Sequence, residues 1–86
     1  MVIKPIYKTD STRIQEYVPL SDPDYKTFTV TVSQYKDFME DDNWLPATVS
    51  YPSSRLSNEQ VLELAAALTA AAQLAMEWTN NPPKGK

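Results

Sequence analysis

Apolar and polar residues alternate along the middle of the chain in short runs typical of β-strands. The clearest run is Lys26–Val32, in which Phe28, Val30 and Val32 share one face and threonines fill the other. Trp44–Tyr51 repeats the pattern, although Pro46 places its start at a sheet edge or in an irregular entry. We expect both runs to be strands with one face on the core. The second run would turn inward the following residues: Leu45, Ala47, Val49 and Tyr51.

The remaining segments before residue 56 carry weaker patterns. Val2–Lys8 has extended character, but Pro5 cannot donate to a strand ladder, so this segment is an edge strand or an arm. Thr12–Val18 is a plausible second strand, and Leu20–Tyr25 is rich in residues that favour turns. Ser33–Asn43 is ambiguous, because its apolar residues have helical spacing while its start continues a strand into a long hairpin loop.

The period changes after Leu56, where the chain becomes an alanine-rich helix. Ser57 is a good N-cap, and Gln60 has the spacing that completes a capping box. Leu56 and Val61 have the spacing of a hydrophobic staple. Asn80 and Asn81, followed by Pro82 and Pro83, end the helix.

The apolar arc of this helix is wider than one sheet usually needs. At about 100° per residue, its centre falls on Val61, Leu64 and Leu68, which we expect to pack on the strands. A flank remains beside this centre, made of Ala67, Ala71, Leu74 and Trp78. Two interpretations stay open: the flank finishes the core against the N-terminal strands, or it is an interface to a second copy or another protein. The strand residues expected beneath the centre are Phe28, Val30, Val32, Val49 and Tyr51.

These elements predict one small α+β domain. The chain has 86 residues, enough for a single modest core. We expect an antiparallel sheet of about three to four strands with the long C-terminal helix packed on one face, in keeping with such strand and helix runs. The domain covers residues 1–81, and residues 82–86 form a flexible tail.

Composition narrows the chemistry. The chain has no histidine, no cysteine and a single glycine, Gly85. This inventory excludes His-based acid–base catalysis, the usual zinc sites and glycine-rich phosphate loops. The sequence therefore predicts a protein that is not an enzyme, with no catalytic residues, no metal and no cofactor.

The net charge of −3 comes from one acidic segment around Glu40, Asp41 and Asp42. No basic stripe supplies the phosphate-neutralising charge that nucleic-acid binding needs. The acidic run lacks the ligand spacing and the glycine of a calcium loop, and a solvated turn explains it. Its functional alternative is an electrostatic contact to a basic partner, with Trp44 as the anchor.

The location of the protein follows from what the sequence lacks. No charged segment followed by an apolar run opens the chain, so no secretory signal is expected. The longest uncharged apolar run, Leu64–Met76, is shorter than the roughly 20 residues that span a bilayer. We expect a cytoplasmic protein that does not enter a membrane.

Strands followed by a capped alanine-rich helix resemble a pattern in small uncharacterised proteins of actinobacteria and their phages. The resemblance covers about the last 40 residues of this sequence, and residues 1–43 match nothing in that pattern. It implies a small accessory protein that binds a protein rather than catalysing a reaction, in the host cytoplasm if it is phage-encoded. The matching residues are Leu56, Ser57, Glu59, Gln60, Leu64, Ala65, Ala66, Ala67, Leu68, Ala71 and Ala72.

Three functions follow in order of expectation. The first is a non-enzymatic protein-interaction module, such as a phage or mobile-element modulator of a host protein. The second is a self-associating structural protein that forms a homodimer through the helix. The third, a nucleic-acid-binding regulator, is disfavoured by charge. The expected partner-binding residues are Glu40, Asp41, Asp42, Trp44, Ala67, Ala71, Leu74 and Trp78.

Overall fold

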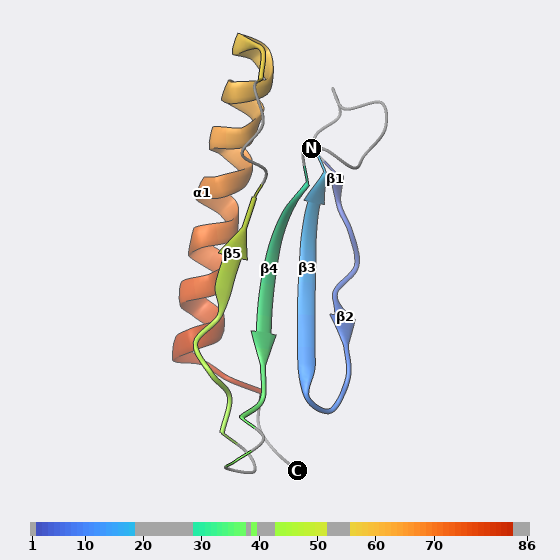
Figure 1. Cartoon of the computed structure of the whole chain (residues 1–86), viewed down its shortest axis with the longest axis vertical. Helices are drawn as coiled ribbons and strands as arrows, with labels where there is room; N and C mark the ends of the chain where they lie inside the picture. Colours follow the sequence, from blue (N-terminus) through green and yellow to red (C-terminus); the bar gives the residue numbers. More distant parts are fainter. Residues whose placement is uncertain (1, 19–28, 38, 40–42, 52–55, 84–86) are drawn as a thin grey trace.

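The computed structural model of the chain has an antiparallel sheet with one long helix on one side (Figure 1). The structure describes residues 2–18, 29–37, 39, 43–51 and 56–83. The predicted α+β class is therefore confirmed. The strands are β1 (Val2–Ile3), β2 (Tyr7–Lys8), β3 (Thr12–Val18), β4 (Val30–Tyr35) and β5 (Thr48–Ser50), and the helix is α1 (Asn58–Asn80).

The strand order across the sheet is β1–β3–β4–β5, with β2 also paired to β3. β1 and β2 are two parts of one edge strand that is interrupted around Pro5, which explains why the sheet has more strands than expected. Ile3 pairs with Tyr17 and Tyr7 pairs with Ile14, so the edge strand carries one more residue than β3 between these pairs. The extra residue is a β-bulge, which moves Tyr7 to the face opposite that of Ile3.

The bulge is held by a side chain as well as by the ladder. The Lys4 backbone N–H donates to the Glu16 carbonyl at 3.0 Å, and the amide of Gln15 donates to the Lys4 carbonyl. The second bond satisfies a carbonyl that the irregular ladder leaves without a strand partner. Gln15 is buried with its amide on this carbonyl, although glutamines are usually exposed.

β4 differs in position from the strand expected at Lys26–Val32. It begins at Val30 and continues to Tyr35, and Lys36 forms an isolated bridge to Trp44. The ambiguous segment therefore continues the strand at its start, and the helical interpretation is wrong for Ser33–Asp37. Residues 26–28, with Phe28, lie outside the described residues, as does the turn predicted at Leu20–Tyr25.

α1 begins as the sequence predicts. The Ser57 hydroxyl accepts from the Gln60 backbone N–H at 3.2 Å, and the Gln60 side chain accepts from the Ser57 N–H at 2.9 Å. This reciprocal capping box satisfies backbone donors that the first helical turn leaves unpaired. The local sequence therefore determines where the helix starts.

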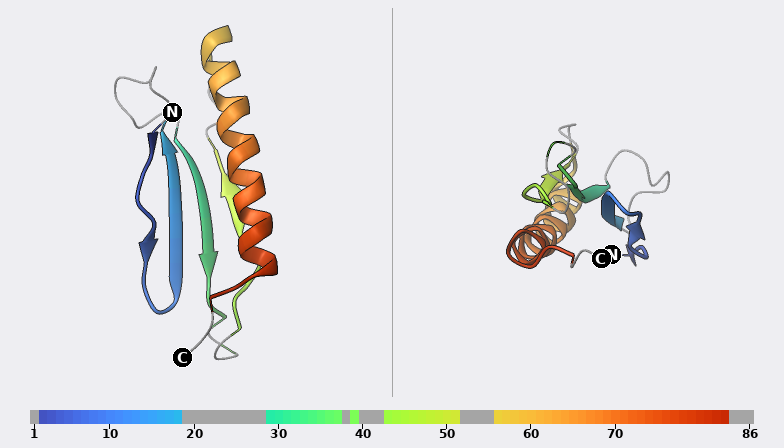
Figure 2. Two further views of the ribbon diagram at one scale, coloured as in Figure 1. Left: turned by 180° about the vertical axis from the view of Figure 1, so that it is seen from behind. Right: turned by 90° about the horizontal axis from the view of Figure 1, so that it is seen from below.

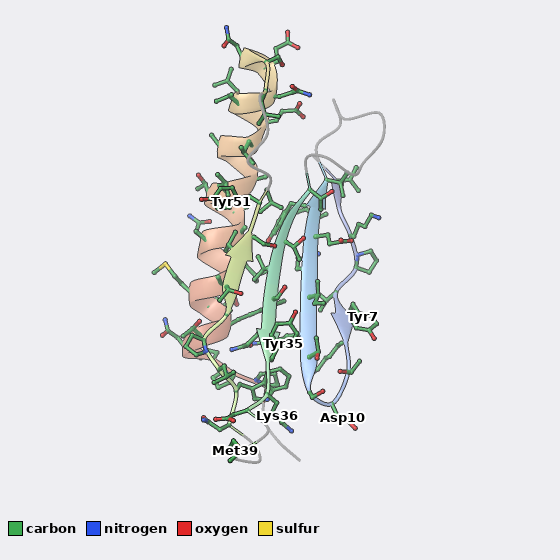
Figure 3. All side chains as sticks on the ribbon, viewed as in Figure 1. Tyr7, Asp10, Tyr35, Lys36, Met39 and Tyr51 are labelled. Atoms are coloured by element: carbon green, nitrogen blue, oxygen red, sulfur yellow. The ribbon has the colours of Figure 1, made fainter. Side chains whose placement is uncertain are left out.

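α1 lies over β4 and β5, with a smaller contact to β3 (Figure 2). Cross-strand register puts Tyr17, Val30, Val32 and Val49 on the face of the sheet that the helix covers. The buried cluster between the layers consists of Tyr17, Val30, Val32, Ala67, Ala71, Ala75 and Trp78. Tyr51, expected in this core, is 58% exposed and follows the end of β5 (Figure 3).

Candidate functional site

The helix meets the sheet through the flank that we considered as an interface. Ala67 and Ala71 are 0% exposed and Trp78 is 5% exposed, because they pack on the sheet within the same chain. Leu74 is half-buried against the same cluster. The prediction that these residues contact a partner is therefore corrected to the alternative, in which the flank completes the core.

The expected centre of the helix contact is also corrected. Val61 is 49% exposed, whereas Leu64 and Leu68 are half-buried at the margin of the cluster. The physical reason is size: a line of alanines lets the helix axis approach the valines of β4 more closely than a line of leucines would. The helix is rotated relative to the sequence prediction, and a different side of it faces outward.

Of the predicted acidic contact, only Trp44 lies among the described residues; Glu40, Asp41 and Asp42 lie outside them. Trp44 is half-buried beside the end of β4, where Lys36 lies 5.8 Å and Arg13 5.9 Å from the centre of its ring. These distances suit cation–π contacts. Figure 3 shows Lys36 and Met39 at the end of the molecule where α1 ends. Trp44 therefore faces cations of its own chain.

Beneath Trp44, a polar cluster that the sequence did not reveal closes the C-terminal end of α1. Arg13 Nε donates to Gln34 Oε1 at 2.7 Å, and Gln34 Nε2 donates to the carbonyls of Leu45 at 2.9 Å and Trp78 at 3.2 Å. Arg13 Nη2 donates to the Trp78 carbonyl at 3.2 Å and to the Asn81 carbonyl at 3.4 Å. A cation on these carbonyls offsets the negative end of the helix dipole.

Arg13 is also stacked, with its guanidinium carbon 4.3 Å from the centre of the Trp78 ring. Burial lowers the pKa of Arg13, while the carboxylate of Glu77 acts in the opposite direction. Burial raises the pKa of the neighbouring Tyr17, and Glu77 raises it further. The hydrogen bonds described above for Arg13 Nε and Nη2 and for the Gln34 amide all go to groups of the same chain, so we assign this cluster a structural role.

The surface that the rotated helix presents is apolar and lies beside β5. We call it the outer flank and define it by Val61, Ala65, Ala72 and Met76. Val61 is 49% and Met76 65% exposed, and the alanines between them are exposed as well. None of these residues is charged. At about 100° per residue they occupy one side of the helix, while Glu59, Glu63 and Glu77 occupy another. Of these, Glu77 acts electrostatically on Arg13 and Tyr17 of β3.

A recess opens at the C-terminal end of the outer flank, between α1 and the segment that enters β5. It has a volume of about 230 Å³ and is lined by Ala47, Ala75, Met76, Thr79 and Asn80. The Thr79 hydroxyl bridges its walls: it donates to the Ala75 carbonyl at 2.8 Å and accepts from the Ala47 N–H at 2.9 Å. These two hydrogen bonds hold the walls of the recess together within the single chain.

Two further features of the described residues bear on the site. They include no group of three or more His, Cys, Asp or Glu side chains placed to hold a metal ion. By length and composition alone, α1 is apolar enough to cross a membrane, a test that the core helix of a soluble protein also passes. The uncharged run Leu64–Met76 is only part of this helix, so its length alone underestimates the apolar length of α1.

Comparison with known proteins adds no relative. No protein family, no curated protein and no solved structure matches the chain. The resemblance to small actinobacterial and phage proteins stays a prediction.

Proposed function

We propose that this protein is a non-enzymatic protein-interaction module that contacts its partner through the outer flank of α1. The observation that carries the proposal is an exposed helix side without charge, on which Val61 and Met76 stand at the ends and Ala65 and Ala72 lie between them. Large contiguous apolar patches are uncommon on monomeric proteins, and an apolar patch rimmed by polar residues marks a contact site. Interface cores are likewise depleted in charge and enriched in methionine.

The rigidity of the flank supports this role. α1 is fixed at its N-terminus by the capping box and at its C-terminus by Arg13 and Gln34. Its inner side is held by the buried alanines. A partner therefore binds a surface that is already ordered in the folded chain, so binding loses little further conformational entropy.

The partner of a phage or mobile-element modulator would be a host protein, and the partner of an assembly protein would be a second copy of the chain. Both use the same surface and the same type of contact. The cytoplasmic location expected from the sequence fits either form of the proposal.

Site-specific photo-crosslinking in the source cell tests the proposal. A photoreactive residue replaces Ala65 on the outer flank in one variant and Ala66 in the other. Both alanines are exposed and adjacent, so the variants differ in the side of the helix that carries the probe. We expect a discrete crosslinked protein band from position 65 and little or none from position 66.

Equal crosslinking from both positions, or none from either, would contradict the proposal. Crosslinking of position 65 to lipid would also overturn it, because the flank would then be a membrane-contact surface. Circular dichroism of both variants provides the control that each one folds.

A further inference from the structure

We infer that the occupant of the outer flank is a second copy of this chain, packed with its α1 antiparallel across a two-fold axis between Leu68 and Thr69. The inference rests on the proposed function and names its partner. Three observations carry it: the order of residues along the flank, the recess at one end of the flank, and the placement of charge on the helix.

The flank has the same order of side-chain sizes in both directions. A two-fold axis between Leu68 and Thr69 places Val61 opposite Met76 and Ala65 opposite Ala72 of the other copy. Large side chains then meet at the ends and small ones in the middle. An isologous interface requires this kind of self-complementarity, whereas a foreign partner does not. The alanines allow the two helix backbones to approach closely.

The recess supplies a matching cavity at the end where this arrangement needs one. Met76, Thr79 and Asn80 line it, and the same two-fold axis brings Val61 of the other copy opposite Met76. Val61 is 49% exposed in the single chain although it is a branched apolar residue. Each copy therefore carries a projecting side chain at one end of the flank and a recess at the other, and the axis brings them together twice.

Charge favours the antiparallel orientation. The acidic residues of α1 lie on a different side of the helix from the flank, so the contact buries no carboxylate. Antiparallel packing also brings the positive N-terminal end of each helix dipole beside the negative C-terminal end of the other. Parallel packing would instead place like dipole ends side by side.

The sheet edge beside the flank does not offer an alternative way to pair. β5 has 3 residues and follows Pro46 closely, features that limit edge-to-edge pairing. The helices therefore make the contact, and the edges of the sheets do not need to join.

Light scattering coupled to size exclusion tests the stoichiometry with the full chain. We expect twice the chain mass of 9.7 kDa for the natural sequence. Ala65→Glu and Ala72→Glu place a carboxylate in the contact and should raise the dissociation constant at least about tenfold, giving monomers at micromolar concentration. Ala66→Glu, on the neighbouring side of the helix, should leave the dimer mass unchanged.

Disulfide trapping tests the register, and the chain offers a clean background because it has no cysteine. A mixture of Ala65→Cys and Ala72→Cys chains should form the heterologous disulfide in good yield under mild oxidation. Neither variant alone should crosslink well, because like positions lie about 10 Å apart along the helix axis, and a disulfide needs Cα atoms within about 7 Å. Homologous crosslinks from Ala65→Cys would show a parallel pair and overturn the orientation.

A monomer at all concentrations would overturn the inference. If photo-crosslinking from position 65 still captured a protein, the proposed function would stand with a foreign occupant. If that crosslinking also failed, both would fall. The two proposals therefore fail on different results.

Discussion

Gln34 on β4 and Arg13 on β3 donate hydrogen bonds to the C-terminal end of α1. The last turn of α1 contains no basic residue, so nothing on the helix itself complements its C-terminal carbonyls. Gln34, 1% exposed, donates to the Trp78 carbonyl and orients the guanidinium of Arg13 against that carbonyl as well. Because Gln34 is buried and bonds to Arg13 and to two carbonyls, its removal leaves these groups without that partner.

Gln34→Leu should therefore lower the free energy of unfolding by about 1–3 kcal/mol, since the Leu45 carbonyl and Arg13 Nε lose their buried partner. Gln73→Leu is the matched control, because Gln73 is an exposed glutamine on α1. Urea unfolding followed by circular dichroism measures both. A loss at Gln34 no larger than that at Gln73 would mean that the cluster contributes nothing to stability.

Tyr17 predicts a specific alkaline sensitivity. Burial, and then the charge of Glu77, raise its pKa above the ordinary value of 10.0, so the folded chain keeps the phenol protonated where the unfolded chain ionises it. The unfolded state binds fewer protons above that pH, so the stability from this group is complete below about pH 10 and declines as pH rises. Tyr17→Phe should flatten the fall of the melting temperature above pH 10, whereas Tyr51→Phe, at an exposed tyrosine, should not. Identical slopes in all three proteins would contradict this account.

At the scale of the elements, local signals fixed where the helix starts but not which side of it faces the sheet. Ser57 and Gln60 specify the cap through contacts within one turn, which is why the sequence was sufficient there. The facing side depends on the valines of β4 and on the close approach that Ala67 and Ala71 permit. Hydrophobic periodicity weights leucine above alanine and therefore pointed to the wrong line.

The strands divide in the same way. Thr12–Val18 appears with the predicted bounds, and Pro5 marks the edge strand as predicted. The burial of Gln15 and Gln34 could not be predicted, because each side-chain amide donates to a backbone carbonyl that only the tertiary structure brings near it. The recess near Thr79 could not be predicted either, because it forms where Ala47, which is distant in the sequence, contacts the helix.

The cap provides the test at the element scale. Ser57→Ala removes the hydroxyl that accepts from Gln60 and should lower the free energy of unfolding by about 1 kcal/mol. Ser57→Asp keeps an acceptor at the same position and adds a favourable charge at the helix N-terminus, so it should retain the stability. Chemical denaturation of the three proteins compares them. An equal loss in the Asp variant would show that the cap does not act through this hydrogen bond.

The molecule is elongated, and its core contains few large apolar side chains. Its radius of gyration is 14.1 Å and its extents are 43 × 20 × 18 Å, whereas a compact chain of this length has a radius of about 12 Å. Among the residues that the structure describes, the large buried apolar side chains are Tyr17, Val18, Val30, Val32 and Trp78, and alanines fill the rest of the core. Small domains with so little buried apolar area commonly gain stability from association.

The thermal stability of the chain should therefore depend on its concentration. If the native state is a dimer, raising the protein concentration about a hundredfold favours the folded dimer over two unfolded chains by about 2.7 kcal/mol, and the melting temperature rises by several degrees. Ala65→Glu should remove this dependence by removing the contact, and Ala66→Glu should preserve it. Differential scanning calorimetry at several concentrations measures the slope. A melting temperature that is constant with concentration in the natural sequence would mean that the small core sustains the fold alone, and it would contradict the dimer.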